Sequence, residues 1–171
     1  MILSDRDIRR YIGEGKLVVE PMSSDTIRAN GLDLRIGGVV ARPREVAEPV
    51  DPESCDPRSC YEVADYGEYL VLRPGEHVLI HTLEYIRMPR DVVGLIGIRS
   101  TYARMGLHTP LTVVDAGYEG QLTVQLRCGS IPLRLRRGAR VVHLVLVKAL
   151  SEADRPYSGR YQGRRGISLP R

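Results

Sequence analysis

The residues best suited to chemistry lie in the segment 113–127, where a carboxylate and an aromatic ring interrupt an apolar stretch. Asp115 follows two valines, and Tyr118 stands between two glycines. Such a glycine-rich turn between apolar runs is typical of a β-hairpin. A carboxylate at the turn can take a proton from water, while the ring packs against a flat or sugar-like substrate. The segment therefore predicts a hairpin that carries a general base.

Gln125 is the second informative residue of this segment. Side chains alternate along a strand, so one face carries Leu122, Val124 and Leu126, and the other carries Gln121, Thr123, Gln125 and Arg127. An amide has no proton to exchange in the working pH range and can only donate and accept hydrogen bonds. A reaction that needs a second acid in addition to Asp115 does not find it at residue 125.

The segment 97–106 offers a candidate phosphate site. After an apolar run it presents Arg99, two hydroxyls at Ser100 and Thr101, and then Arg104 in an expected helical turn. The free backbone amides of a helix start and two guanidinium groups can bind phosphate oxygens. The alternative is a capped helix whose arginines are solvated.

Two further segments combine charge with glycine. Asp33 lies in the apolar stretch 30–37, and the tail 159–168 contains Tyr161, Gln162 and Arg165 among glycines. Glycines permit close approach to a ligand, and arginines supply charge. Each segment also has a plainer interpretation, because a buried aspartate can satisfy backbone amides and a basic tail can be solvated.

Charge and composition indicate which class of ligand the protein binds. The net charge is +4, and arginines crowd the last quarter of the chain, which favours an anionic ligand. No helix-turn-helix or RNA-recognition motif is evident, so we expect a small anion and no nucleic acid. Three cysteines without a matching histidine pattern argue against a zinc site. No apolar run approaches the roughly 20 residues that span a membrane, and the charged start does not resemble a signal peptide, so we expect a cytoplasmic protein.

The elements around these segments predict an all-β fold in one domain over residues 1–171. Ser4 caps a short N-terminal helix that ends near Gly13. Short runs rich in valine, isoleucine and leucine predict eight strands at 17–20, 32–40, 69–72, 77–83, 92–98, 111–115, 121–127 and 141–147. Eight strands in one domain imply a sandwich, a jelly roll or a barrel. The stretch 43–61 is expected to be an exposed insertion, and 151–171 a flexible arm.

Taken together and in this order, the four segments resemble the dUTPase and dCTP deaminase superfamily over nearly the whole chain. The opening 2–8, the block 99–106 and the tail 161–166 are similar to the dCTP deaminase branch. The segment 114–120 is similar to the third dUTPase motif.

The resemblance implies a homotrimer of distorted jelly rolls, with active sites between subunits and the arm folded over a bound triphosphate. Asp115 matches the acid that activates water, Tyr118 the ring beneath the deoxyribose, and Asp33 the aspartate associated with Mg²⁺. The residues that match substrate contacts are Arg99, Ser100, Thr101, Arg104, Val114, Gln125, Tyr161, Gln162 and Arg165.

The departure from the deaminase branch is at residue 125, where that branch has a glutamate that shuttles protons. We therefore expect a dUTP diphosphatase that hydrolyses dUTP to dUMP and pyrophosphate with Mg²⁺, Asp115 activating the water. The alternatives are a dCTP deaminase or a bifunctional enzyme that makes dUMP from dCTP, a non-catalytic nucleotide-binding regulator, and a β-sandwich interaction domain.

Overall fold

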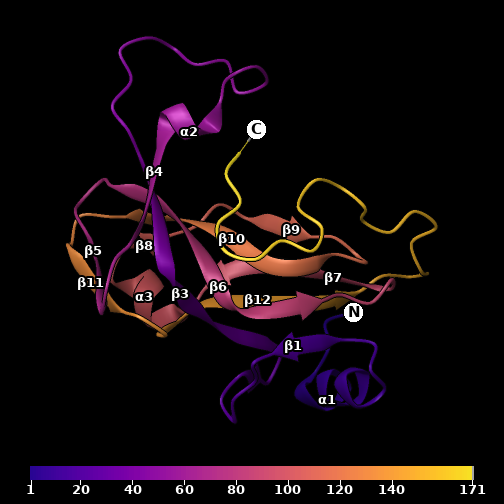
Figure 1. Cartoon of the computed structure of the whole chain (residues 1–171). Coiled ribbons are helices and arrows are strands. Elements are labelled where there is room, and N and C mark those ends of the chain that lie inside the picture. The colour runs from indigo at the N-terminus through magenta and orange to yellow at the C-terminus, as the bar shows by residue number, and fades with distance from the viewer. Residues whose placement is uncertain (171) are drawn as a thin grey trace.

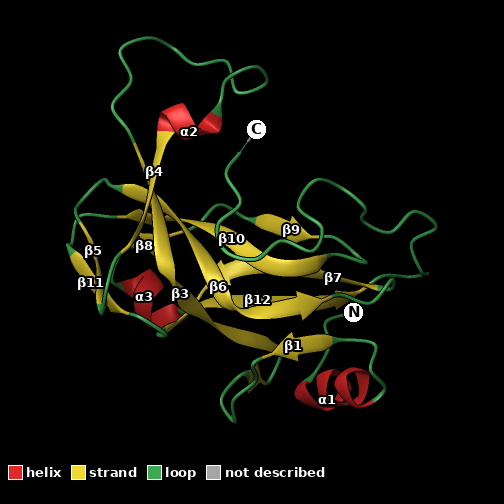
Figure 2. Cartoon of the chain, viewed as in Figure 1, coloured by secondary structure: helices red, strands yellow, loops and turns green. Residues whose placement is uncertain are grey.

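The computed structural model describes residues 1–170 and consists mainly of antiparallel strands (Figures 1 and 2). Its elements in chain order are α1 (Asp5–Gly13), β1 (Val18–Glu20), β2 (Ile27–Arg28), β3 (Gly31–Pro43), α2 (Pro57–Cys60), β4 (Tyr61–Asp65), β5 (Tyr69–Leu72), β6 (His77–Arg87), β7 (Val92–Ile98), α3 (Ser100–Arg104), β8 (Leu107–His108), β9 (Thr112–Val114), β10 (Glu119–Cys128), β11 (Leu133–Arg136) and β12 (Arg140–Lys148). The predicted all-β class and the short N-terminal helix are confirmed.

Most strands form one curled sheet with the order β8-β10-β6-β3-β12-β7-β9. Strands β1, β2 and β4 pair on its flanks, and β5 and β11 form a separate two-stranded ribbon. Figure 2 shows the strands as the body of the molecule, with the helices at its periphery. All eight predicted strand regions are present, and β2, β4, β8 and β11 were not predicted.

The long strand β3 produces much of the curl, because it pairs with β12 over its first half and with β6 over its second. Its register shifts between Ile36 and Val40. Gly37 lies in this interval, where the ring of His81 packs so closely that a Cβ would stand 2.0 Å from its Cε1 atom. Only a glycine lets the two strands approach at this point.

The cap of α1 forms as predicted. The Ser4 hydroxyl accepts a hydrogen bond from the Asp7 backbone N–H, and the Asp7 carboxylate accepts one from the Ser4 N–H. Ile8 and Tyr11 on the inner face of the helix are buried. The reciprocal bonds satisfy two N–H groups that a helix start otherwise leaves free.

The core is one contiguous cluster, to which β10 contributes one face. Leu122, Val124 and Leu126 are each at most 4% exposed, while the alternate residues remain half-buried. Burying each such side chain stabilises the fold by roughly 1.5–3 kcal/mol. The alternation read from the sequence is therefore confirmed, and it leaves Gln121, Thr123 and Gln125 on the opposite face.

Two local expectations, the hairpin and the flexible arm, differ from the structure, whereas the predicted insertion is exposed as expected. The segment around Asp115 is not a hairpin, because β9 pairs with β7 and β10 pairs with β6 and β8. The insertion 43–61, which projects from one end of the sheet in Figure 1, contains the helical turn α2 and ends where β4 begins. The arm 151–170 folds back along β10 (Figure 1). Among the described helices, none has the length and apolarity required to cross a bilayer.

Candidate active site

Asp115 follows the last residue of β9, at the start of a tight turn. The Tyr118 N–H donates to the Asp115 carbonyl over 3.1 Å, and Gly117 has φ +82°. A side chain at Gly117 would also meet Pro156, whose Cβ lies 2.5 Å from the position of an added Cβ. The turn therefore requires glycine, and it leaves the Asp115 side chain exposed.

The turn connects β9, at one edge of the curled sheet, with β10, which lies next to the strand at the other edge. A cavity of about 530 Å³ is lined in part by this turn. Five residues expected at the site line it together, namely Val114, Asp115, Tyr118, Gln125 and Tyr161. The other lining residues are Tyr61, Leu79, Ile96, Thr112, Val113, Gln121, Leu122, Thr123, Tyr157, Ser168 and Pro170. Among the described residues of this lining, Asp115 is the one with a side-chain carboxylate.

Tyr118 forms a fixed wall of the cavity. Its hydroxyl donates to the Gln121 carbonyl over 2.9 Å, and its ring packs edge-on against Tyr157 with centroids 5.5 Å apart. Burial, with smaller effects of Tyr157 and Tyr85, raises the pKa of the Tyr118 hydroxyl to about 12. The hydroxyl therefore stays protonated at neutral pH and keeps its bond to the backbone.

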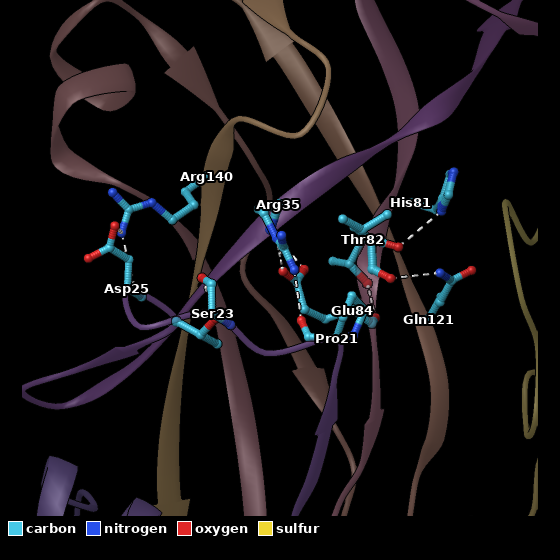
Figure 3. Close-up of polar contacts among 11 residues, drawn as sticks. Pro21, Ser23, Asp25, Arg35, His81, Thr82, Glu84, Gln121 and Arg140 are labelled. Carbon is cyan, nitrogen blue, oxygen red and sulfur yellow. Dashed lines mark hydrogen bonds and ion pairs between the residues drawn. The ribbon is translucent and has the colours of Figure 1, made fainter.

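Gln121 and Gln125 lie on the same face of β10, and within the described residues the side chain of Gln121 is the one of the two held by hydrogen bonds. Its amide nitrogen donates to the Leu83 carbonyl over 2.9 Å, next to the buried polar cluster of Thr82 and Glu84 (Figure 3). Its amide oxygen accepts from the Gly166 N–H over 2.6 Å. Gln125 is half-buried opposite Leu79 and contributes its side chain to the cavity.

Asp33 does not have the surroundings expected of a Mg²⁺ ligand. Its carboxylate is 3% exposed and lies 2.7 Å from Nε of Arg99, 3.6 Å from Nε of Arg28 and 2.9 Å from Nδ1 of His143. Two guanidinium groups already compensate its charge, so it is poorly suited to a divalent cation. The described residues contain no cluster of three or more His, Cys, Asp or Glu side chains that could hold a metal. These residues do not fit the expected Mg²⁺ site.

The candidate phosphate block also lies away from the cavity. Arg99 points inward, to Asp33 and to the Arg140 carbonyl at 2.9 Å. Ser100, Thr101 and Arg104 form the short helix α3 and do not line the cavity of their own chain. The helical turn expected there is present, but a single chain does not bring it to Asp115.

The arm brings one of its three expected residues into the cavity, Tyr161. Gln162 instead binds the turn, accepting from the Glu119 N–H and donating to the Gly117 carbonyl, both over 3.0 Å. The guanidinium of Arg165 stacks on Tyr85, with Cζ 4.4 Å from the ring centroid.

Several lining residues had not been assigned to the site. Gln121 and Thr123 share the polar face with Gln125, so the alternation of β10 already indicated them. Tyr157 lies four residues before Tyr161 in the arm. Its aromatic side chain was the only feature of the sequence that could have indicated a place in the cavity. Tyr61 has no local signal, because the pairing of β4 with β3 brings it to the cavity from the end of the insertion.

Comparison with known proteins identifies the family. The family model described as dCTP deaminase-like matches residues 2–149. The chain belongs to the dCTP deaminase-like family. This dCTP deaminase-like chain is 52% identical over 172 residues to a dCTP deaminase of Aeropyrum pernix, covering 100% of the chain and 96% of that protein. It is also 44% identical to a probable deoxyuridine 5′-triphosphate nucleotidohydrolase of Sulfolobus islandicus rod-shaped virus 1, covering 99% of the chain and 98% of that protein.

Solved structures show the same fold. The 2′-deoxycytidine 5′-triphosphate deaminase of Agrobacterium tumefaciens superposes with a TM-score of 0.68 and 23% identity over 85% of the dCTP deaminase-like chain. The chain spans 46% of that protein. A Staphylococcus bacteriophage 80alpha dUTPase superposes with a TM-score of 0.52 and 18% identity, over 84% of the chain and 89% of that protein. The curled sheet is therefore of the dUTPase-like type.

These relatives correct the expected activity. The prediction of a dUTP diphosphatase was wrong, because full-length relatives at 52%, 44% and 43% identity are named dCTP deaminase. That prediction depended on one residue, Gln125, against a similarity that extends over the whole chain. The coarser expectation of an enzyme of nucleotide metabolism is supported, since the relatives are enzymes that act on deoxynucleoside triphosphates.

Proposed function

We propose that the chain is a dCTP deaminase, in which water displaces the 4-amino group of cytosine so that dCTP and water give dUTP and ammonia. The observation that carries the proposal is the cavity that gathers Asp115, Tyr118 and Gln125, in a chain half identical to a named dCTP deaminase over its full length. The Tyr118 ring supplies an apolar wall suited to a deoxyribose or a base.

Asp115 has the central role, because no other side-chain carboxylate lines the cavity within the part of the chain that the structure describes. It takes one proton from the attacking water and passes it to the amino group, which leaves as ammonia, while the second water proton ends on N3 of the uracil that forms. Gln125 cannot move a proton, but its amide oxygen can accept a hydrogen bond from the 4-amino group and orient the ring. No step of this scheme passes through Mg²⁺, since Asp33 is compensated by arginines.

Product analysis tests the proposal directly. The purified protein is incubated separately with dCTP and with dUTP, and the nucleotides are separated by chromatography. Formation of dUTP from dCTP supports deamination, and formation of dUMP from dCTP supports the bifunctional form. Hydrolysis of dUTP with dCTP left untouched overturns the proposal. The Asp115→Asn variant is the control, and we expect it to bind dCTP but to lose turnover.

We also propose that the site is completed by a neighbouring copy in a homotrimer. Among residues 1–170, which the structure describes, no arginine lines the cavity, although a triphosphate carries several negative charges. The short helix α3 carries the exposed Arg104, and none of its residues lines the cavity of its own chain. A second copy can supply this helix without any change in the fold of the first.

A further inference from the structure

The arm is docked on β10 through a series of backbone hydrogen bonds. The Gln121 N–H donates to the Arg164 carbonyl over 2.9 Å, and the Gly163 N–H donates to the Glu119 carbonyl over 2.7 Å. Gly120 and Arg164 form a parallel bridge, so the arm extends the sheet at the start of β10. The Ser168 N–H donates to the Thr123 hydroxyl over 2.9 Å.

Two side chains of the sheet reinforce this docking. Gln121 links the Leu83 carbonyl of β6 to the Gly166 N–H of the arm, as described above. Tyr85 of β6 donates its hydroxyl to Glu119 over 3.0 Å and presents its ring to the Arg165 guanidinium. Burial, followed by the bond to Glu119, raises the pKa of the Tyr85 hydroxyl, which therefore remains a donor at neutral pH.

This arrangement gives Arg165 a role different from the substrate contact expected of it. A guanidinium over an aromatic face is attracted to the ring electrons, and Glu119 beside the ring adds an opposite charge. Arg165 is absent from the cavity lining, whereas Tyr161, Ser168 and Pro170 of the same arm are present. The stacked arginine therefore lies between the parts of the arm that form the cavity wall.

We propose that Tyr85 is a positioning residue, which holds the arm against the sheet through Arg165 and so keeps Tyr161, Ser168 and Pro170 in the wall of the cavity. Gln121 acts with it by fixing Gly166 to the sheet. The latch, defined as Tyr85, Glu119, Gln121 and Arg165, acts on the arm and not on the reacting atoms. Its existence does not depend on the proposed deamination, although its effect on KM does.

Limited trypsin digestion of the nucleotide-free protein tests the latch, because trypsin cleaves after arginines and Arg160, Arg164 and Arg165 lie in the arm. Loss of an exposed stacking contact weakens docking roughly two- to fivefold, and cleavage follows the open population when reclosing is fast. We expect Tyr85→Leu to speed cleavage in the arm by that factor, while cleavage after Arg58 in the insertion is unchanged. The Tyr85→Phe variant keeps the ring and should restore most of the protection.

A matched control is available in the same chain. Arg134 stacks on Tyr69 with Cζ 4.6 Å from the ring centroid, between β11 and β5. Tyr69→Leu removes the same kind of contact without touching the arm, so arm cleavage should stay at the wild-type rate. Equal rates in wild type and Tyr85→Leu, or equal acceleration by Tyr69→Leu, would overturn the proposal.

Steady-state kinetics separates positioning from a general loss of structure. In Tyr85→Leu we expect the KM for dCTP to rise two- to fivefold with kcat unchanged, because the arm closes less often but the reacting groups remain. A fall in kcat with unchanged KM contradicts the assignment. If the protein does not deaminate dCTP at all, the proposed function fails, while the digestion of the nucleotide-free protein still decides whether the latch exists.

Discussion

Asp115 and Gln125 stand ten positions apart and line one cavity, one from a turn and the other from a strand. Only the first of them carries a group that can accept and release a proton, because a side-chain amide can only donate and accept hydrogen bonds. The proposed deamination therefore depends on a single carboxylate, with the amide limited to orienting the cytosine. A single acid can perform this chemistry, but it must serve both the attacking water and the departing ammonia.

The variant Gln125→Glu tests whether Asp115 alone transfers protons while residue 125 only orients the cytosine. A second carboxylic acid at this place can protonate the leaving group, and positioned acids or bases typically contribute 10²- to 10⁴-fold. We expect the rate of dUTP formation from dCTP to rise about tenfold or more. The control is Gln125→Met, similar in size but unable to hydrogen bond, which should fall below wild type. An unchanged rate in Gln125→Glu would show that residue 125 does not face the reacting carbon.

His81 supplies a prediction about acid stability. The ring is 9% exposed, its Nδ1 lies 3.0 Å from the Thr82 carbonyl, and burial, chiefly, lowers its pKa below the ordinary value of 6.5. The folded protein therefore favours the neutral ring, and this stability is complete above pH 6.5 and lost as the pH falls through the lowered pKa. Urea unfolding at pH 7.5 and 5.5 should give a larger loss in wild type than in His81→Gln. If the free energy of unfolding falls equally in both proteins, His81 does not contribute to the pH dependence of stability.

At the scale of elements, the β6–β10 pair sets the shape of the cavity face. The register shifts between Gln121 and Thr123, and the Leu122 N–H donates to the Thr82 hydroxyl over 2.9 Å. The same hydroxyl donates to the Glu84 carbonyl over 2.8 Å, within the buried cluster drawn in Figure 3. Glu84 in turn binds Nε of Arg35 at 2.6 Å. This cluster supports the irregularity that turns Gln121 toward the arm.

The variant Thr82→Val tests whether the Thr82 hydroxyl stabilises the register shift between β6 and β10. Valine has nearly the shape of threonine but leaves a buried N–H without its partner, which costs about 1–3 kcal/mol. We expect the free energy of unfolding in urea to fall by that amount. Thr112→Val makes the same chemical change on the exposed edge strand β9 and should change stability by less than about 0.5 kcal/mol. Similar losses in both variants would mean that the Thr82 hydroxyl has no special role.

At the scale of the whole molecule, the cavity and α3 occupy different parts of the surface of one chain. The proposed trimer joins them by placing α3 of one copy against the cavity of the next. Exposed apolar residues such as Leu111 and Val113, the latter also lining the cavity, are available for contacts between copies. The arm latch remains within each chain, so closure and assembly are separate events.

Mixed oligomers test the shared site. Asp115→Asn and Arg104→Ala are each expected to be inactive alone, but after co-expression about a quarter of the sites should combine an intact Asp115 with an intact neighbouring Arg104. We therefore expect about a quarter of the wild-type activity. Co-expression of Asp115→Asn with Tyr118→Leu, two changes in the same cavity, should restore none. No recovery in the first mixture would place both residues in the same copy's site.

The sequence by itself determined the elements and much of the cavity. Capping residues gave α1, periodic apolar runs gave the eight main strands, and the alternation of β10 placed Gln125 opposite the core, because these patterns reflect local backbone geometry. It could not determine that β9 and β10 separate to different edges, that β4 brings Tyr61 to the cavity, or that Asp33 is compensated by Arg99. Only the tertiary structure decided these points, since each depends on pairing between segments far apart in the chain, where strand order and register follow from how the whole sheet curls around its core.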